Sequence, residues 1–297
     1  MKHAMVERGG GQPTLGEAME CCGVAIAPDA MHIGARRMAR LRAQDRYEWL
    51  KIRRDGIGGS DAGALLGVNR HKSSRRVLAD KLAEVKARRT PMRSPFGARA
   101  GGGGALQFGA DIERHVFWLL EKRAQRSALL EGDELGTLVH PEYAWGRANI
   151  DGLVLTPERT RNPGEPGVSI LEIKHTTVPN KYDAGPPLSY IAQVHYYMWV
   201  TGTQRAVIAT LVLHSSAERR ALAQRARRYE RAVGHSRPED AHPYARMLHQ
   251  KLRFDVVERD EGMIEELVVT SRAFWSDVTQ AVCHDFFASD NLSLFDT

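Results

Sequence analysis

The sequence predicts a mixed α/β domain, in which helices come first and a small set of strands follows. Apolar residues recur at helical spacing between residues 45 and 125, and the period then changes toward two between residues 148 and 176. A further helical segment separates the second predicted strand from the third, so the chain crosses between strands through a helix. We therefore expect a central mixed β-sheet flanked by helices.

The chain begins with an expected arm and four expected helices. Residues 1–38 are rich in Gly, Ala and Met with weak periodicity, which predicts a loosely ordered N-terminal arm before a single domain over residues 39–297. The first expected helix starts at Asp45, and the other three cover Asp61–Leu66, Ser73–Arg89 and Leu106–Gln125. A Pro- and Gly-rich stretch between the last two predicts an insertion near residues 90–105.

The later elements alternate between strands and helices. Strands are expected in residues 148–156, 168–176, 205–214 and 251–260, and helices in residues 187–202 and 262–282. Polar, turn-forming residues predict a second insertion near residues 157–168. The Arg-rich segment 215–250 predicts a third, with a basic helix around residues 218–231 that fits a DNA-facing strip and an ordinary solvated helix equally well.

Composition narrows the class of protein. The 297 residues carry 42 Lys and Arg against 36 Asp and Glu, a net charge of +6 that is compatible with a polyanionic partner. The three cysteines form no Cys-x-x-Cys pair, so they cannot supply four thiolates to an iron–sulfur cluster, and their sparse count favours a reducing cytoplasm. The sequence contains no apolar signal-peptide core and no run of 18 apolar residues, so we expect no membrane span.

The stretch GIGGSDAGALLG, residues 56–67, combines glycines with Ser60 and Asp61 at an expected helix start. Two interpretations are open. Either Ser60 or Asp61 caps the helix after an ordinary glycine turn, or backbone N–H groups, the hydroxyl and the helix start together hold an anion such as a phosphate. Arg53, seven residues before Ser60, favours the second interpretation because a guanidinium and a hydroxyl suit a terminal phosphate.

Acidic residues on two successive strands predict a metal site. Asp151 begins one expected strand, and Glu172 and Lys174 lie two apart on the next, so these two share a face. If the strands are neighbours, Asp151 and Glu172 converge on one hard divalent cation, to which the Ile173 carbonyl adds an oxygen. Lys174 would then stand beside a metal-bound water that it orients or helps to deprotonate.

The same spacing also arises by chance, as an exposed Glu–Lys pair beside an unrelated turn aspartate. Further residues favour a site. Glu113, on the helix before the strands, offers another carboxylate. Gln193 and Tyr197 lie four apart and share one face of the helix that follows the second strand, where a glutamine can position water or a phosphate.

The order of these motifs resembles the YqaJ-type viral recombinase family. Arg53 and GIGGSDA come first, Glu113 follows, and IDGLV, LEIK and YIAQVHYYMWVTG come next. The segment FDVVERDEGMIEELV extends the resemblance over most of residues 45–280. This family contains the phage lambda exonuclease and belongs to the PD-(D/E)xK nuclease superfamily, so the resemblance implies a restriction-endonuclease-like core.

The resemblance implies a catalytic role for five residues of the chain. It makes Asp151 and Glu172 the metal-binding carboxylates and Lys174 the catalytic lysine. Glu113 becomes an additional acidic residue of the site, and Gln193 becomes the helix glutamine that supports it.

The resemblance also implies a pocket for the 5′-phosphate of the strand being cut. Arg53 and Ser60 match the arginine and serine that bind it. Asn149 stands where the lambda enzyme has a phosphate-contacting serine, and it can still donate a hydrogen bond. Ile150 replaces the proline that usually precedes the metal-binding aspartate.

The activity implied is that of a Mg²⁺-dependent deoxyribonuclease, with Mn²⁺ as a substitute, which degrades linear double-stranded DNA 5′ to 3′ from its ends. It would leave 3′ single-stranded tails for phage-type homologous recombination. An endonuclease or structure-selective nuclease on the same fold stays open, as does a catalytically inactive DNA-binding module. The intact Asp151, Glu172 and Lys174 argue against the inactive module.

The resemblance further implies DNA ends and a single-strand annealing protein as partners, and a ring-shaped homotrimer. The insertions near residues 157–168 and 215–250 have no clear counterpart and can block or rebuild the surfaces between subunits. The expected location is the cytoplasm, that of a bacterial host for a phage-encoded protein.

Overall fold

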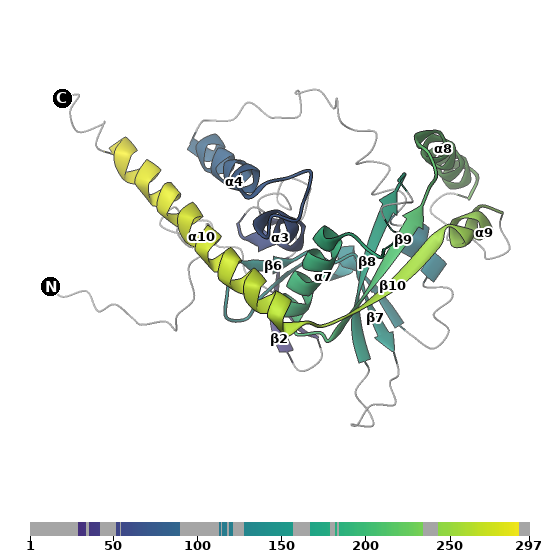
Figure 1. Ribbon diagram of the computed structural model, residues 1–297, viewed down its shortest axis with the longest axis horizontal. Coiled ribbons are helices and arrows are strands. Elements are labelled where there is room, and N and C mark those ends of the chain that lie inside the picture. The colour runs from purple at the N-terminus through teal and green to yellow at the C-terminus, as the bar shows by residue number, and fades with distance from the viewer. Residues whose placement is uncertain are drawn as a thin grey trace.

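The computed structural model arranges the chain as two sheets and a set of helices (Figure 1). It describes residues 29–33, 36–41, 52–53, 55–89, 113, 115–117, 119–120, 128–156, 167–178, 182, 184–233 and 243–290. The insertion predicted near residues 90–105, and residues 157–166 of the next one, lie outside the described residues.

One five-stranded sheet, here the β8 sheet, carries the strands predicted from period-two spacing. Its strand order is β10 (Leu252–Glu258), β9 (Arg205–Val212), β8 (Gly167–Thr176), β7 (Gly152–Thr156), β4 (Ala128–Glu131). β8 and β9 are parallel and the other neighbours antiparallel, so the sheet is mixed. Residues 167 and 168, assigned above to an insertion, belong to β8 because they pair with the end of β7.

The other five-stranded sheet, here the β6 sheet, was not predicted. Its strand order is β1 (Asp29–Ile33), β2 (Arg36–Leu41), β5 (Thr137–Val139), β6 (Gly146–Ala148), β3 (Ile57–Gly58). The prediction of a loose arm over residues 1–38 is therefore wrong for β1 and the start of β2, which pair with each other, and β2 pairs in turn with β5. Strands of two to six residues carry little periodic signal, and β5, the partner of β2, lies far from β2 in the sequence.

Where the structure describes them, the predicted helices occur near their expected positions. Residues 45–51 and most of residues 106–125, where two of them were expected, lie outside the described residues. The structure has α3 (Gly59–Leu65), α4 (Ser74–Arg89), α6 (Gly132–Leu135), α7 (Leu188–Thr201), α8 (Ser216–Val233), α9 (Pro243–Gln250) and α10 (Glu261–Asp290). The described residues between 113 and 120 are helical, as are residues 52 and 53. None of the helices in the described ranges is long and apolar enough to cross a membrane.

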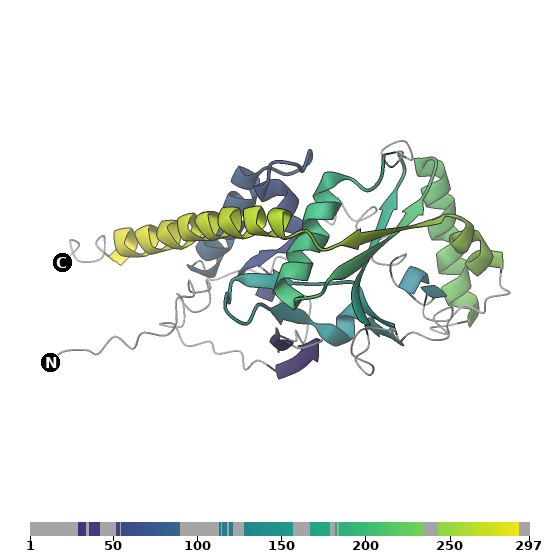
Figure 2. The same ribbon diagram turned by 60° about the horizontal axis from the view of Figure 1, so that its bottom comes forward.

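α7 is the central helix of the domain. It crosses between the parallel strands β8 and β9, and it contacts both sheets as well as α3 and α10 (Figure 2). Residues 192–201 are buried on every side, as expected of a helix enclosed by other elements. Gly202, with φ of 75°, ends the helix in the left-handed region that favours glycine.

The β8 sheet is covered on both faces. Ile170 packs in the core that contains α7, whereas Leu171 and Ile173 pack against Val116 and Phe117 of the helical segment between residues 113 and 120. A mixed sheet flanked by helices confirms the predicted fold class.

The basic helix α8 lies at the end of the molecule remote from the C-terminal end of α10 (Figure 2). Leu222 and Ala226 pack in a small cluster with Leu248 of α9, while Arg220 and Arg228 are exposed. The helix is thus amphipathic, and both interpretations of its basic face stay open.

Candidate active site

β8 and α7 together build a buried carboxylate site. Glu172 is 1% exposed, and its Oε1 accepts hydrogen bonds from Lys174 Nζ and, at 2.6 Å, from Gln193 Nε2. Glu172 and Lys174 share the face of β8 that α7 covers, as their spacing predicts. The glutamine thus binds the glutamate rather than the lysine.

The second oxygen of Glu172 is the unusual feature of the site. Oε2 is buried and has no hydrogen-bond partner among the described residues. Burial, followed by the negative charge of Asp151, raises the pKa of Glu172 to about 8, against the opposing effect of Lys174. A buried carboxylate oxygen without a donor is energetically costly, so a cation at this oxygen would stabilise the ionised form.

Asp151 lies directly before β7 and faces the middle of β8. Its Oδ2 accepts the backbone N–H of Ile173 at 2.6 Å. In an extended strand the N–H and C=O of one residue point to the same side. The Ile173 carbonyl is therefore directed toward the side of β8 on which Asp151 lies, as the predicted metal ligand requires.

Glu113 brings another carboxylate to the same place. Its side chain is half-buried and hydrogen-bonds to that of Asp151. Burial, the charge of Asp151 and then that of Glu172 raise the pKa of Glu113 to about 9. The charge of Asp151 thus raises the pKa of both Glu113 and Glu172, so the site has excess negative charge.

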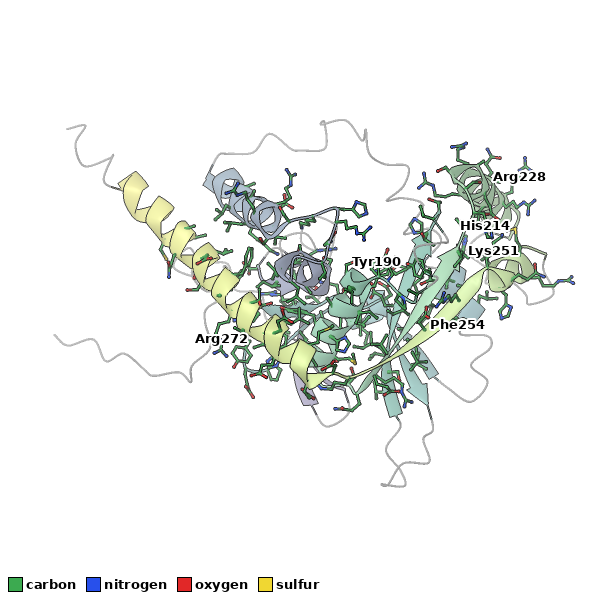
Figure 3. The ribbon with its side chains drawn as sticks, in the orientation of Figure 1. Tyr190, His214, Arg228, Lys251, Phe254 and Arg272 are labelled. Atoms are coloured by element: carbon green, nitrogen blue, oxygen red, sulfur yellow. The ribbon has the colours of Figure 1, made fainter. Side chains whose placement is uncertain are left out.

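Lys174 partly balances this charge. Burial lowers its pKa, but the carboxylates of Glu172 and Asp151 outweigh burial and raise it above its usual range. Its Nζ also lies 5.4 Å from the centroid of the Tyr190 ring, in the first turn of α7 (Figure 3). Lys174 is therefore a cation here, which favours orienting water or a phosphate over accepting a proton.

The donor set fits a hard divalent cation. Within the described ranges, no group of three or more His, Cys, Asp and Glu side chains is placed to hold a metal ion by itself. Mg²⁺ is usually held by one or two carboxylates, with water and substrate phosphate completing its ligands. Asp151, Glu172 with its unpartnered Oε2 and the Ile173 carbonyl match that requirement.

Tyr197 connects this site to the glycine-rich stretch. Gln193 Nε2 lies 3.1 Å from the Tyr197 hydroxyl, one turn further along α7. A Cβ on Gly59 would lie 2.3 Å from Cε1 of the Tyr197 ring, and a Cβ on Gly56 would lie 2.4 Å from the Trp145 carbonyl oxygen. Packing against protein atoms therefore explains why glycine occupies positions 56 and 59.

We expect Gly59→Ala to lower the free energy of unfolding by about 1–2 kcal/mol. Overpacking costs about 1–3 kcal/mol, and the better helix propensity of alanine offsets less than about 1 kcal/mol. Gly58→Ala is the matched control, because its Cβ would meet nothing closer than 3.9 Å. Urea unfolding measures both variants, and equal stabilities would show that the Tyr197 contact is not limiting.

Arg53 and Ser60 meet as predicted. The Arg53 guanidinium donates a 2.6 Å hydrogen bond to the Ser60 hydroxyl at the start of α3. The charge of Arg53 is also among the causes that lower the pKa of Glu172, so the guanidinium lies within electrostatic reach of the carboxylate site. Asn149, two residues before Asp151, accepts a 2.6 Å bond from the Thr137 hydroxyl through its Oδ1, so its NH₂ group faces away from Thr137.

Sequence reasoning missed Lys81 and the full role of Asp61. Lys81 is only 5% exposed and forms an ion pair with Asp61 at 3.2 Å. The available signal was its position, four residues after the buried Val77 on the same face of α4, where a charge is unusual. Asp61 also accepts a long bond, 3.5 Å, from the Gly58 N–H, so the capping interpretation holds in part.

Comparison with known proteins gives three similarities. Residues 48–204 match the YqaJ-like viral recombinase domain. The protein YqaJ of Bacillus subtilis (strain 168) is 31% identical over 180 residues, which are 59% of this chain and 49% of that protein, so the chain spans about half the length of this relative. The alkaline exonuclease LHK-Exo of Laribacter hongkongensis has a TM-score of 0.55 at 18% identity, over 83% of this chain and 99% of that one. LHK-Exo in complex with dAMP gives the same values.

The likeness to LHK-Exo concerns the fold and confirms the predicted core. The matched domain covers more than half of the chain, and it runs from before Arg53 to beyond Gln193. All the residues brought together at the carboxylate site thus fall inside it. The chain belongs to the YqaJ-like viral recombinase domain family.

Proposed function

We propose that the protein is a metal-dependent deoxyribonuclease that shortens linear duplex DNA from its 5′ ends. The observation that carries this proposal is the buried Glu172, which is bonded through one oxygen to Lys174 and Gln193 and has no described partner at the other. Membership of a viral recombinase family and the fold shared with an alkaline exonuclease support it.

The carboxylates would bind the cation. Asp151, Glu172 and the Ile173 carbonyl would hold Mg²⁺, with Glu113 beside them, and Mn²⁺ would substitute because it accepts the same oxygen ligands. When bound, the cation would supply Lewis-acid activation of water and of the phosphoryl oxygen. The chain's own contribution is positional: Gln193 and Lys174 fix Oε1 of Glu172, so that Oε2 is oriented to bind the cation.

The Arg53–Ser60 pair would bind the terminal 5′-phosphate. The guanidinium lies within electrostatic reach of Glu172, so a phosphate held there would place the next phosphodiester near the carboxylates. Lys174 would donate to that phosphodiester and stabilise the charge that develops on it. Cleavage in this register would release 5′-mononucleotides and leave a 3′ single-stranded tail.

We expect Arg53→Ala to slow cleavage of 5′-phosphorylated ends by roughly 10- to 100-fold, because a hydrogen bond to a charged group contributes about 1.5–3 kcal/mol. Ends that carry a 5′-hydroxyl should be much less affected. Initial rates on the two substrates measure the difference. Arg272→Ala, on the exposed side of α10 (Figure 3), is the control. An equal loss on both ends would contradict the phosphate pocket.

The resemblance adds a homotrimeric ring and a single-strand annealing protein to the proposal. Light scattering on the purified chain tests the first, and co-purification with the annealing protein tests the second.

The decisive test compares linear 5′-phosphorylated duplex with covalently closed circular duplex, in Mg²⁺ and in EDTA. Asp151→Asn serves as the blank. Release of mononucleotides from the linear DNA alone is the expected result. Nicking of the circle would favour an endonuclease, and DNA binding without cleavage of either substrate would favour an inactive binding module.

A further inference from the structure

We propose that Lys81 is a positioning residue for the 5′-phosphate pocket. It lies in α4, outside the carboxylate site, and its side chain reaches beneath the segment that joins Arg53 to Ser60. The inference rests on the proposed function, because it concerns the pocket that Arg53 and Ser60 form.

The Lys81 ammonium contacts three acceptors in the described part of the chain. Nζ donates to the Gly56 carbonyl at 2.5 Å, reaches the Arg53 carbonyl at 3.5 Å and pairs with Asp61 Oδ2 at 3.2 Å. An ammonium has three N–H donors and no acceptor, so these contacts can use all of them. Two lie on the segment that carries Arg53, and the third lies in α3, directly after Ser60.

The cost of burial indicates that this lysine has a specific task. Lys81 shares its helix face with the buried Val77, and taking an ammonium out of water costs several kcal/mol even after relaxation. Burial lowers the pKa of Lys81, while Asp61 opposes the shift. For Asp61, burial raises the pKa, but Lys81 and Lys72 outweigh it and bring it to about 2. Each side chain of the pair thus favours the charged form of the other against the cost of burial.

The lysine joins the two halves of the pocket. Arg53 and Ser60 are seven residues apart, and their 2.6 Å bond requires the segment between them to fold back. Ile57 holds the far side of that segment, through a 2.7 Å bond to the Trp145 carbonyl and a 2.9 Å bond from the Tyr196 hydroxyl. Lys81 binds the carbonyl oxygens of residues 53 and 56 in the same segment and connects them to Asp61 of α3. Without it, Arg53 would lose the backbone support that sets its distance from Ser60.

The experiment measures phosphate preference in Lys81→Met. The probes are hairpin duplexes with a 5′-phosphate or a 5′-hydroxyl, and the preference is the ratio of their affinities, measured by anisotropy in EDTA so that cleavage plays no part. We expect the ratio to fall roughly tenfold. The same fall is expected for Arg53→Ala, because the charged hydrogen bond from the Arg53 guanidinium to the phosphate is displaced in one variant and lost in the other. The double variant Arg53→Ala/Lys81→Met should show no further fall.

Lys72→Met is the matched control. Lys72 also pairs with Asp61, at 3.1 Å. In the described part of the chain, however, no hydrogen bond joins Lys72 to the carbonyl oxygens of residues 53 and 56. Its phosphate ratio should remain that of the wild type. A second variant, Asp61→Asn/Lys81→Met, removes both buried charges, which is often neutral for stability, and should lose the ratio as well.

Each remaining outcome is decisive. A folded Lys81→Met that keeps the wild-type ratio overturns the inference, and so does failure of both Lys81 variants to fold, because Lys81 would then act on the whole domain. A wild-type ratio near one would instead contradict the proposed 5′-phosphate pocket itself.

Discussion

Glu172→Gln is expected to reduce cleavage by roughly 10³-fold while the protein stays folded, because a metal ion supplies several kcal/mol of transition-state stabilisation. The amide keeps the size of the side chain but replaces one anionic oxygen with an NH₂ group, which cannot bind a cation. Gln193 and Lys174 donate to Oε1, so the substitution removes the negative charge to which both of these donors bind.

Two measurements check this expectation. Initial rates of nucleotide release in Mg²⁺ report the loss of cleavage, and calorimetric titration with Mn²⁺ reports metal binding without any turnover. Glu266→Gln is the matched control, because Glu266 is exposed on α10. A Glu172→Gln protein that cleaves within tenfold of the wild-type rate, or binds Mn²⁺ equally well, would show that Glu172 is not a metal ligand.

The carboxylate site could be predicted because its geometry is local. Period two alone places Glu172 and Lys174 on one face of β8, and spacing of four alone places Gln193 beside Tyr197 on α7. The pairing of β7 with β8 then required only that successive strands be neighbours, which is the commonest arrangement. Arg53 and Ser60 followed from their residue types as well as from the resemblance, and the structure brings them into contact.

The β6 sheet could not be predicted, because its information is not local. β3 has two residues, and it pairs in parallel with β6 through Ile57 and Gly146. No periodic pattern exists at that length, and the strand is held by what surrounds it. The same holds for Gly59: the sequence shows a glycine, but only the fold shows that the Tyr197 ring occupies the space of its missing side chain.

Asp61→Ala is expected to lower the free energy of unfolding by about 3–5 kcal/mol, because it leaves the Lys81 ammonium buried without its counterion. The Asp61 side chain is 9% exposed and that of Lys81 is 6% exposed, so water cannot replace the lost carboxylate. Asp80→Ala is the control. Asp80 pairs with Lys72 and Arg76 but is 42% exposed, and exposed pairs contribute only about 0–1 kcal/mol.

The pH dependence of Asp61→Ala separates a lost ion pair from lost packing. Burial lowers the folded-state pKa of Lys81, and without Asp61 nothing in the pair opposes that shift. Between this lowered pKa and the unfolded value near 10.5 the unfolded chain binds more protons, so the variant's stability must rise with pH. Burial already lowers the pKa of Lys81 in the wild type, but removal of Asp61 lowers it further. The stability of the variant therefore rises with pH over a wider range than that of the wild type, and urea unfolding at pH 6 and pH 9 should show a smaller deficit at the higher pH. A deficit that is equal at both values would mean that the cost is one of packing, and that the ammonium beneath Arg53 does not depend on Asp61 to remain charged.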